Sequence, residues 1–267
     1  MPSRIANLGY HTDCIFHQQD GMVEEREDHW VIRTPTNPTF WFGNLVLFKT
    51  APLPGDFERW HQIHAAAFGQ TLNHITLGWD EDAPGETDPF TAAGFEFNRD
   101  IVLAMSAYAG GVRIHPQLTI RPILNDADWL AVTALQVEVD RDDFSYRADN
   151  GEFRTNQAAS YRKLTARGRG HYWGAFDGDT LVGSMGLYFD AAGSVGRFQY
   201  VTTRASHRRQ RVCTTLLDHV IRHAFATVKP DLLVINTGAE DTNPAKTVYQ
   251  SIGFQVAMHS YAVTRLL

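Results

Sequence analysis

The residues best equipped for chemistry lie in a short basic loop between an apolar segment and an amphipathic helix. Residues 198–203 have β-forming character, and the loop after them contributes Arg204, His207, Arg208, Arg209 and Arg211. From Val212 to Phe225 apolar residues recur at helical spacing, which predicts a helix with one buried face. The first turn of a helix leaves N–H groups without partners, so the loop and the helix end together predict a site for an anion such as pyrophosphate.

A second pattern follows downstream of this helix. Residues 231–237 have the composition of a short buried strand, and residues 243–254 read Asn-Pro-Ala-Lys-Thr-Val-Tyr-Gln-Ser-Ile-Gly-Phe. The strand, the Arg-x-x-x-x-small loop and the helix resemble the acyl-CoA-binding motif of the GNAT superfamily of N-acyltransferases. Residues 243–254 resemble its second hallmark, Asn-x-Ala-x-x-x-Tyr-x-x-x-Gly-Phe, in full. The resemblance implies an N-acetyltransferase that uses acetyl-CoA.

The first hallmark is matched only in part. Its usual form is Gln/Arg-x-x-Gly-x-Gly/Ala, whereas residues 208–213 place Arg211 and Cys213 where the glycines belong. Glycine lets the main chain approach phosphates without a Cβ in the way. A residue in the helical region needs no positive φ, so we expect Arg211 to hinder the close approach of the main chain to the phosphates without straining the backbone. Its positive charge would compensate in part for the weaker contact. A solvated basic loop that caps a core helix is the alternative interpretation.

The resemblance also implies roles for individual residues. The main chain of Val201 and Thr203 would face the acyl carbonyl and the pantetheine arm, and Asn243 would hydrogen-bond to that arm. Tyr249 would give a proton to the departing sulfur, although its apolar neighbours make a packed core aromatic the competing interpretation. The residues that would surround the pyrophosphate, through main-chain N–H groups and charge, are Arg208, Arg209, Gln210, Arg211 and Cys213.

The acceptor side and the general base are less sharply indicated. Residues 138–146 are acidic and aromatic, and the corresponding region of the superfamily lines the acceptor side. The candidates for holding an amine are therefore Asp140, Asp142, Asp143 and Tyr146; a solvated acidic loop is the alternative. The candidate bases are Glu138, His207 and Glu240, and water could also serve. His219 and His223 lie four residues apart on the predicted helix, but no third ligand is apparent, so we expect no metal.

Length and element order predict two domains. A chain of 267 residues exceeds the usual size of one domain. Residues 1–116 repeat the element order of residues 117–267, and Ala-Ala-Gly-Phe at 92–95 echoes Ser-Ile-Gly-Phe at 251–254. We expect an α/β (α+β) fold of tandem GNAT-like lobes, each a mixed, mostly antiparallel twisted sheet flanked by helices. Residues 1–116 would be a degenerate lobe that does not bind CoA in the usual way; a coincidental α/β domain is the alternative.

Local signals place several further elements. Residues 1–28 are punctuated by an Asp-Gly turn, which predicts a loose hairpin. Residues 40–49 form a strand pattern, Asp56 is the expected cap of the next helix, and Asp126 is the expected cap of a helix through about Val137.

Composition limits the partners. The formal charge of −6 argues against nucleic acid as the main partner. No signal peptide opens the sequence and no apolar run is long enough for a membrane span, so we expect a cytoplasmic protein. Cys14 and Cys213 fall in different halves, which favours free thiols in a reducing compartment. The expected acceptor is an amine of a small molecule or a peptide, and an oligomer stays open. A non-catalytic ligand- or partner-binding descendant with a degenerate CoA site is the alternative function.

Overall fold

The computed structural model describes residues 4–143 and 150–267, so the candidate acceptor residue Tyr146 lies outside the described residues. The chain groups into two compact units. The first comprises residues 1–103, 236–246 and 256–267, and the second comprises residues 104–235 and 247–255. The units are therefore discontinuous in sequence, and the division into domains at residues 1–116 and 117–267 stays a prediction.

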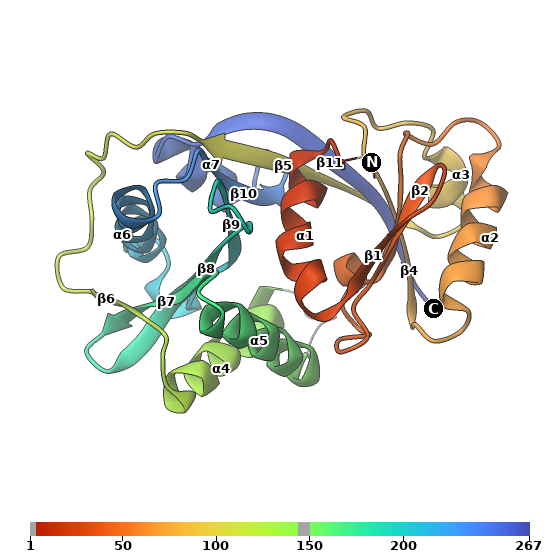
Figure 1. The fold of residues 1–267 in the computed structure, drawn as a ribbon. Helices are drawn as coiled ribbons and strands as arrows, with labels where there is room; N and C mark the ends of the chain where they lie inside the picture. Colours follow the sequence, from red (N-terminus) through yellow and green to blue (C-terminus); the bar gives the residue numbers. More distant parts are fainter. Residues whose placement is uncertain (1–3, 144–149) are drawn as a thin grey trace. The chain divides into compact units, whose positions relative to one another are not determined.

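The first unit contains strands in the order β1-β2-β3-β4-β11-β5 (Figure 1). The parallel pair β3–β4 is joined by α2, whereas β1–β2, β2–β3 and β4–β11 are antiparallel. Its elements are α1 (Leu8–Asp20), β1 (Met22–Glu25), β2 (His29–Arg33), η1 (Trp41–Gly43), β3 (Leu45–Phe48), α2 (Asp56–Phe68), β4 (His74–Trp79), α3 (Asp88–Ala92), β5 (Glu96–Met105) and the C-terminal β11 (Gln255–Leu266).

Strand β3 shows how this unit builds a core on both faces of its sheet. Leu45 belongs to a buried cluster with Tyr10 of α1, and its neighbour Val46 belongs to a cluster with Trp60 of α2. Successive side chains of a strand point to opposite faces, so α1 and α2 cover opposite faces. Phe48 stacks on Trp60 with 3.7 Å between ring centroids. Because both faces of β3 are covered, all four of its residues are apolar and buried.

The predicted hairpin within residues 1–28 is wrong, because residues Leu8–Asp20 of this segment form helix α1. The side-chain oxygen of Asn7 caps the helix by accepting from the N–H groups of Gly9 and Tyr10. The buried Tyr10 hydroxyl donates to the main-chain oxygen of Tyr261 at 2.6 Å. Capping and tertiary packing therefore stabilise a helix whose polar composition gave little helical periodicity.

Three other local predictions need smaller corrections. The strand expected over residues 40–49 is interrupted by η1, where the Asn44 side-chain amide donates to the carbonyl oxygens of Asn37 and Phe40. The residue that caps α2 is Gly55 rather than Asp56. The side chain of Asn125, not Asp126, accepts the N–H of Asp128 in the first turn of the next helix, which runs to Asp143.

The second unit repeats the arrangement, with strands in the order β10-β9-β8-β7-β6. Here the parallel pair β9–β10 is joined by α6, and the other described pairs are antiparallel. The predicted architecture of mixed, mostly antiparallel sheets flanked by helices is confirmed. The elements are β6 (Thr119–Pro122), α4 (Asp126–Asp143), α5 (Gly151–Ala166), β7 (Gly170–Asp177), β8 (Thr180–Phe189), β9 (Val195–Thr203), η3 (Ala205–His207), α6 (Val212–Thr227), β10 (Leu232–Gly238) and α7 (Pro244–Ser251).

Two neighbouring residues of β7 show that helices cover both faces of this sheet as well. The Tyr172 ring lies 5.4 Å from the Trp129 ring of α4, whereas the Trp173 ring lies 4.9 Å from the His223 ring of α6. Helix α6 therefore packs on the face opposite α4.

Cys14 and Cys213 are free thiols, as expected. Every helix in the described part of the chain is too short or too polar to cross a lipid bilayer.

Two buried histidines of the first unit predict a loss of stability in acid. Burial lowers the pKa of His64 from about 6.5 to about 4, helped by the charge of His74, and burial likewise lowers the pKa of His74 to about 4. Between these values the unfolded chain binds more protons, so stability falls as the pH drops from 6.5 toward 4. Each histidine contributes at most about 3 kcal/mol.

Urea unfolding between pH 7.5 and 4 measures this effect. The His64 Nε2 atom is buried without a hydrogen-bond partner among the described residues, so we expect His64→Leu to fold. The free energy of unfolding of this variant should depend less on pH, because the contribution of one of the two histidines is gone. His61→Leu, at a half-buried position on the same helix, is the control. A pH dependence that His64→Leu leaves unchanged would contradict the prediction.

Candidate functional site

The loop before α6 has an unusual backbone. Arg209 and Arg211 both have left-handed conformations, with φ values of 65° and 64°, and Arg211 is the N-cap residue that precedes α6. The expectation that Arg211 needs no positive φ is therefore wrong. The chain turns from the loop into the helix at this residue, and a left-handed residue there is the conformation that glycine adopts without cost.

Hydrogen bonds hold the strained residue in place. The carbonyl oxygen of Arg211 accepts the main-chain N–H of Thr215 at 2.9 Å and the Thr215 hydroxyl at 2.8 Å. The Gln210 side chain donates to the main-chain oxygen of Ser206 at 2.9 Å, which ties the loop to itself. No acidic residue lies in the first turn of α6, so the free N–H groups of that turn face no competing carboxylate.

The arginines of the loop divide into two pairs. Arg204 lies 3.0 Å from a Glu138 oxygen, and Arg208 donates two hydrogen bonds of 2.8 Å to Asp143. Arg209 and Arg211 are exposed, and neither guanidinium has a hydrogen-bond or ion-pair partner in residues 4–143 and 150–267. The uncompensated positive charge of the predicted anion site therefore comes from Arg209 and Arg211.

Strand β9, which leads into this loop, carries a bulge and an open edge. Its pairing with β8 shifts register between Ser184 and Gly186, so that two residues of β9, Tyr200 and Val201, lie opposite Met185. On its other side β9 pairs with β10 only as far as Arg197. The main chain around Val201 and Thr203 is thus released from the β10 ladder, which is where the resemblance placed the acyl carbonyl and the pantetheine arm.

Tyr249 lies on α7 and is 4% exposed. Burial raises the pKa of its phenol well above 10, and the nearby Cys213 thiol raises it further, so the hydroxyl stays protonated. No described group forms a hydrogen bond with this hydroxyl, although its ring packs against the ring of Phe254 with 6.4 Å between centroids. Burial also raises the pKa of Cys213 to about 12, which keeps this residue a neutral thiol.

Asn243 is engaged by its own surroundings. Its amide nitrogen donates to the Thr237 hydroxyl and to the main-chain oxygen of Gly238, both at 2.8 Å, and its oxygen accepts the N–H of Ala245 at 3.0 Å. These bonds fix the turn before α7. Binding of a pantetheine arm by Asn243 stays a prediction.

The acidic residues of α4 are mostly committed to arginines. Asp140 is bonded to Arg154, Asn150 and Tyr200, and Asp143 is bonded to Arg208. Burial alone would raise the pKa of Asp140, but the hydrogen bonds and charge of Arg154 outweigh it and hold this pKa below its ordinary value. Asp142 is exposed.

The candidate bases also have neighbours. Glu138 is paired with Arg204, and His207 lies 3.7 Å from Asp177. Glu240 is exposed and belongs to the first unit. No single base is distinguished by this geometry.

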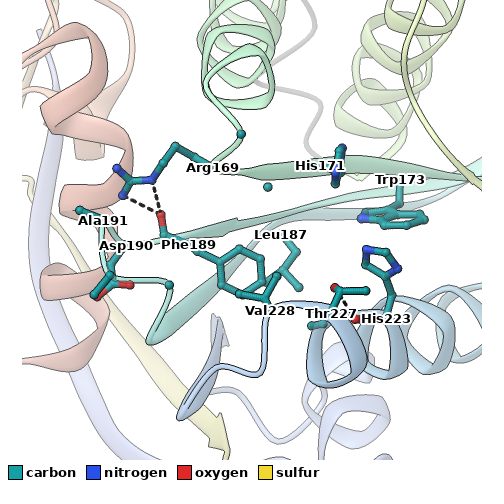
Figure 2. Close-up of a pocket in the computed structure, with 15 residues that line it drawn as sticks. Arg169, His171, Trp173, Leu187, Phe189, Asp190, Ala191, His223, Thr227 and Val228 are labelled. Atoms are coloured by element: carbon teal, nitrogen blue, oxygen red, sulfur yellow. Dashed lines mark hydrogen bonds between the residues drawn. The ribbon is translucent and has the colours of Figure 1, made fainter.

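A cavity of about 430 Å³ lies at the other end of α6 (Figure 2). Figure 2 shows the rings of Trp173 and His223 close together at one side of the cavity and the Arg169 guanidinium bonded to the main-chain oxygen of Phe189 at the other. Since the 16 residues of α6 span about 24 Å, this cavity is separate from the anion site at the helix N-terminus.

His171 also lines this cavity, although the sequence did not indicate it, and its ring lies 6.5 Å from the ring of His223. Burial, and then the charge of His223, lower the pKa of His171. No group of three or more histidine, cysteine or acidic side chains within the described ranges is arranged to hold a metal ion.

Arg154 is the most conspicuous residue that sequence reasoning missed, because α5 contains many polar residues among which it does not stand out. Its position relative to the buried Ala158 and Tyr161 places it on the inward face of the helix. A charged residue at an apolar position of the pattern is the signal that could have identified it.

One family of known proteins matches the part of the chain that contains the loop and α6. Residues 136–254 match the sequence model described as the Acetyltransferase (GNAT) family. Over 84 residues the chain is 31% identical to the uncharacterized N-acetyltransferase YsnE of Bacillus subtilis (strain 168), an alignment that covers 32% of this chain and 55% of that protein. The chain thus spans only about half the length of this curated relative.

Solved structures share the fold over most of the chain. A functionally unknown conserved protein from Staphylococcus epidermidis ATCC 12228 has a TM-score of 0.70 at 13% identity, covering 93% of this chain and 95% of that one. A GCN5-related N-acetyltransferase from Kribbella flavida has a TM-score of 0.63 at 13% identity, covering 97% and 95%. A tandem GNAT protein from the clavulanic acid biosynthesis pathway has a TM-score of 0.54 at 16% identity, covering 90% and 82%. The predicted tandem fold is confirmed.

The left-handed conformation of Arg211 predicts the effect of two substitutions on stability. Arg211→Gly removes both the side chain and the Cβ that disfavours φ of 64°, whereas Arg211→Ala removes the side chain and keeps the Cβ. We expect the glycine variant to be more stable than the alanine variant by about 1 kcal/mol. Thermal unfolding of both variants without ligand measures the difference. A glycine variant that is less stable than the alanine variant contradicts it.

Proposed function

Residues 136–254 belong to the GNAT family of acetyltransferases, and on this basis we propose that the protein transfers an acetyl group from acetyl-CoA to an amine. The observation that carries the proposal is the start of α6. Arg209 and Arg211 have left-handed conformations, which glycine adopts more easily than arginine does. Both guanidinium groups are free of partners among the described residues. Backbone strain that persists in this way is typical of functional sites, and charge with free helix N–H groups suits a pyrophosphate.

The chemistry assigns a task to each part of the second unit. The amine nitrogen attacks the thioester carbon, a C–N bond forms, and the C–S bond breaks. Main-chain N–H groups beside Val201 would stabilise the negative charge that develops on the carbonyl oxygen. The sulfur leaves as a thiolate, to which the Tyr249 hydroxyl would donate. Burial raises the pKa of this phenol, so the hydroxyl carries its proton before the reaction begins. The amine loses its proton to a base or to water.

Calorimetry with acetyl-CoA tests the binding step. We expect binding that weakens as salt rises, because exposed guanidinium groups attract the phosphates. Arg209→Gln and Arg211→Gln should each weaken binding about tenfold or more at low salt, as expected for the loss of a charge-assisted hydrogen bond of about 1.5 to 3 kcal/mol. Arg208→Gln is the matched control, since Asp143 already neutralises that guanidinium, and we expect a smaller loss. A folded parent protein that binds neither acetyl-CoA nor CoA rules the proposal out.

Turnover tests the role of Tyr249. We expect Tyr249→Phe to lower kcat at least about tenfold and to change the dissociation constant of acetyl-CoA little, because the phenol acts on the departing sulfur and the ring stays in place. Release of the CoA thiol with a panel of polyamines, amino acids and lysine peptides measures the rate. Equal rates for Tyr249→Phe and the parent would show that Tyr249 only packs in the core.

A further inference from the structure

A buried ion pair lies against the bulge of β9. Asp140 is 0% exposed and Arg154 is 1% exposed. The Arg154 Nε atom donates to one Asp140 oxygen at 2.6 Å, and Nη2 donates to the other at 2.7 Å. The Asn150 side chain adds a third donor at 3.0 Å. Both oxygens of the Asp140 carboxylate are therefore hydrogen-bonded away from water.

This ion pair holds Tyr200 at two points. The Tyr200 hydroxyl donates to Asp140, and the Arg154 guanidinium lies over the Tyr200 ring, 3.6 Å from Cζ to the centroid. The Tyr200 carbonyl oxygen also accepts a hydrogen bond of 3.2 Å from the Tyr172 hydroxyl. The residue is thus fixed through its hydroxyl, its ring and its main chain.

Tyr200 needs such restraint because its φ is 37°. A positive φ is an outlier for a bulky side chain, and it persists only where the surroundings impose it. The residue that follows is Val201, whose main chain lies at the bulge and at the open edge of β9.

Stability alone does not account for the ion pair. Replacing a buried ion pair by well-packed apolar residues is often neutral or stabilising, because burial removes both charges from water. Unlike apolar packing, the ion pair fixes orientation. Two hydrogen bonds from Arg154 orient the Asp140 carboxylate, and this carboxylate orients the Tyr200 hydroxyl.

We propose that Asp140 and Arg154 are positioning residues that act through Tyr200 to hold the β9 bulge, so that the main chain of Val201 faces the acyl carbonyl of bound acetyl-CoA. The inference rests on the proposed function. It predicts that breaking the link to Tyr200 affects recognition of the acetyl group and leaves recognition of CoA at the α6 N-terminus intact.

Tyr200→Phe breaks this link with the smallest change, since it removes only the hydroxyl that bonds to Asp140. Calorimetry with CoA and with acetyl-CoA gives two dissociation constants, and their ratio isolates the acetyl group. We expect the dissociation constant of CoA to change less than about twofold and the preference for acetyl-CoA to fall about twofold to tenfold, the range for one lost hydrogen bond. Asp140→Asn should also lower the preference for acetyl-CoA. If Asp140→Asn does not fold, Tyr200→Phe alone decides the test.

Tyr188→Phe is the matched control. Tyr188 is a buried tyrosine of the same unit whose hydroxyl donates to the main-chain oxygen of Tyr161 at 3.1 Å and not to Asp140. We expect its loss to leave the preference for acetyl-CoA unchanged. Hydrogen exchange of residues 199–203 without ligand gives a second measurement, and it should become faster in Tyr200→Phe and not in Tyr188→Phe.

The outcomes separate this inference from the proposed function. If the parent binds neither CoA nor acetyl-CoA, the proposed function fails and the inference fails with it. If the parent binds both and Tyr200→Phe leaves the preference for acetyl-CoA unchanged, the inference alone is overturned. An exchange rate of residues 199–203 that does not respond to Tyr200→Phe overturns it as well.

Discussion

The packing of α6 against β7, β8 and β9 is the constraint on which the candidate site depends. Residues along one face of this helix, among them Leu216 and Val220, are 0% exposed, so the helix cannot rotate without uncovering its apolar face. Its N-terminus therefore points in one fixed direction, and the loop from β9 must enter it through left-handed residues at 209 and 211. The strain at Arg211 follows from the helix packing, and the double hydrogen bond from Thr215 maintains it.

Helix α4 decides how charge is distributed around that N-terminus. Its acidic residues Glu138 and Asp143 neutralise Arg204 and Arg208, while Asp140 is buried with Arg154. The acidic segment thus has two physical effects in this structure: it leaves Arg209 and Arg211 as the arginines of the loop without an ion-pair partner among the described residues, and it restrains β9 through Tyr200. Both effects concern the proposed cofactor side, although the sequence had suggested the amine acceptor.

The sequence predicts the parts of the molecule whose signal is local. Helix α6 and strand β10 follow from periodicity and composition at nearly the observed bounds, and the pattern at residues 243–254 locates Tyr249. The parts it misses depend on distant partners. Helix α1 needs the contact between Tyr10 and Tyr261, and no local residue reveals that Arg211 is left-handed, since an arginine is not the usual residue for that conformation. The role of Arg154 depends on Asp140 in another helix.

In both units a helix begins after a left-handed residue, but the charged side chains near the start of the helix differ. Helix α2 of the first unit also follows a strand and begins after a left-handed residue, Gly55 with φ of 94°. Its first turn, however, carries Asp56 and Glu58, and Asp56 accepts the N–H of Leu53 at 2.9 Å. An anion approaching α2 would meet Glu58 and an Asp56 that is paired with Arg59, whereas an anion approaching α6 meets Arg209 and Arg211. The first unit has a glycine at the left-handed position, which suits phosphate binding, but no uncompensated positive charge for the phosphate. The second unit has a strained arginine at that position, and this arginine supplies positive charge. Electrostatics, more than the presence of glycine, therefore distinguishes the unit expected to bind CoA.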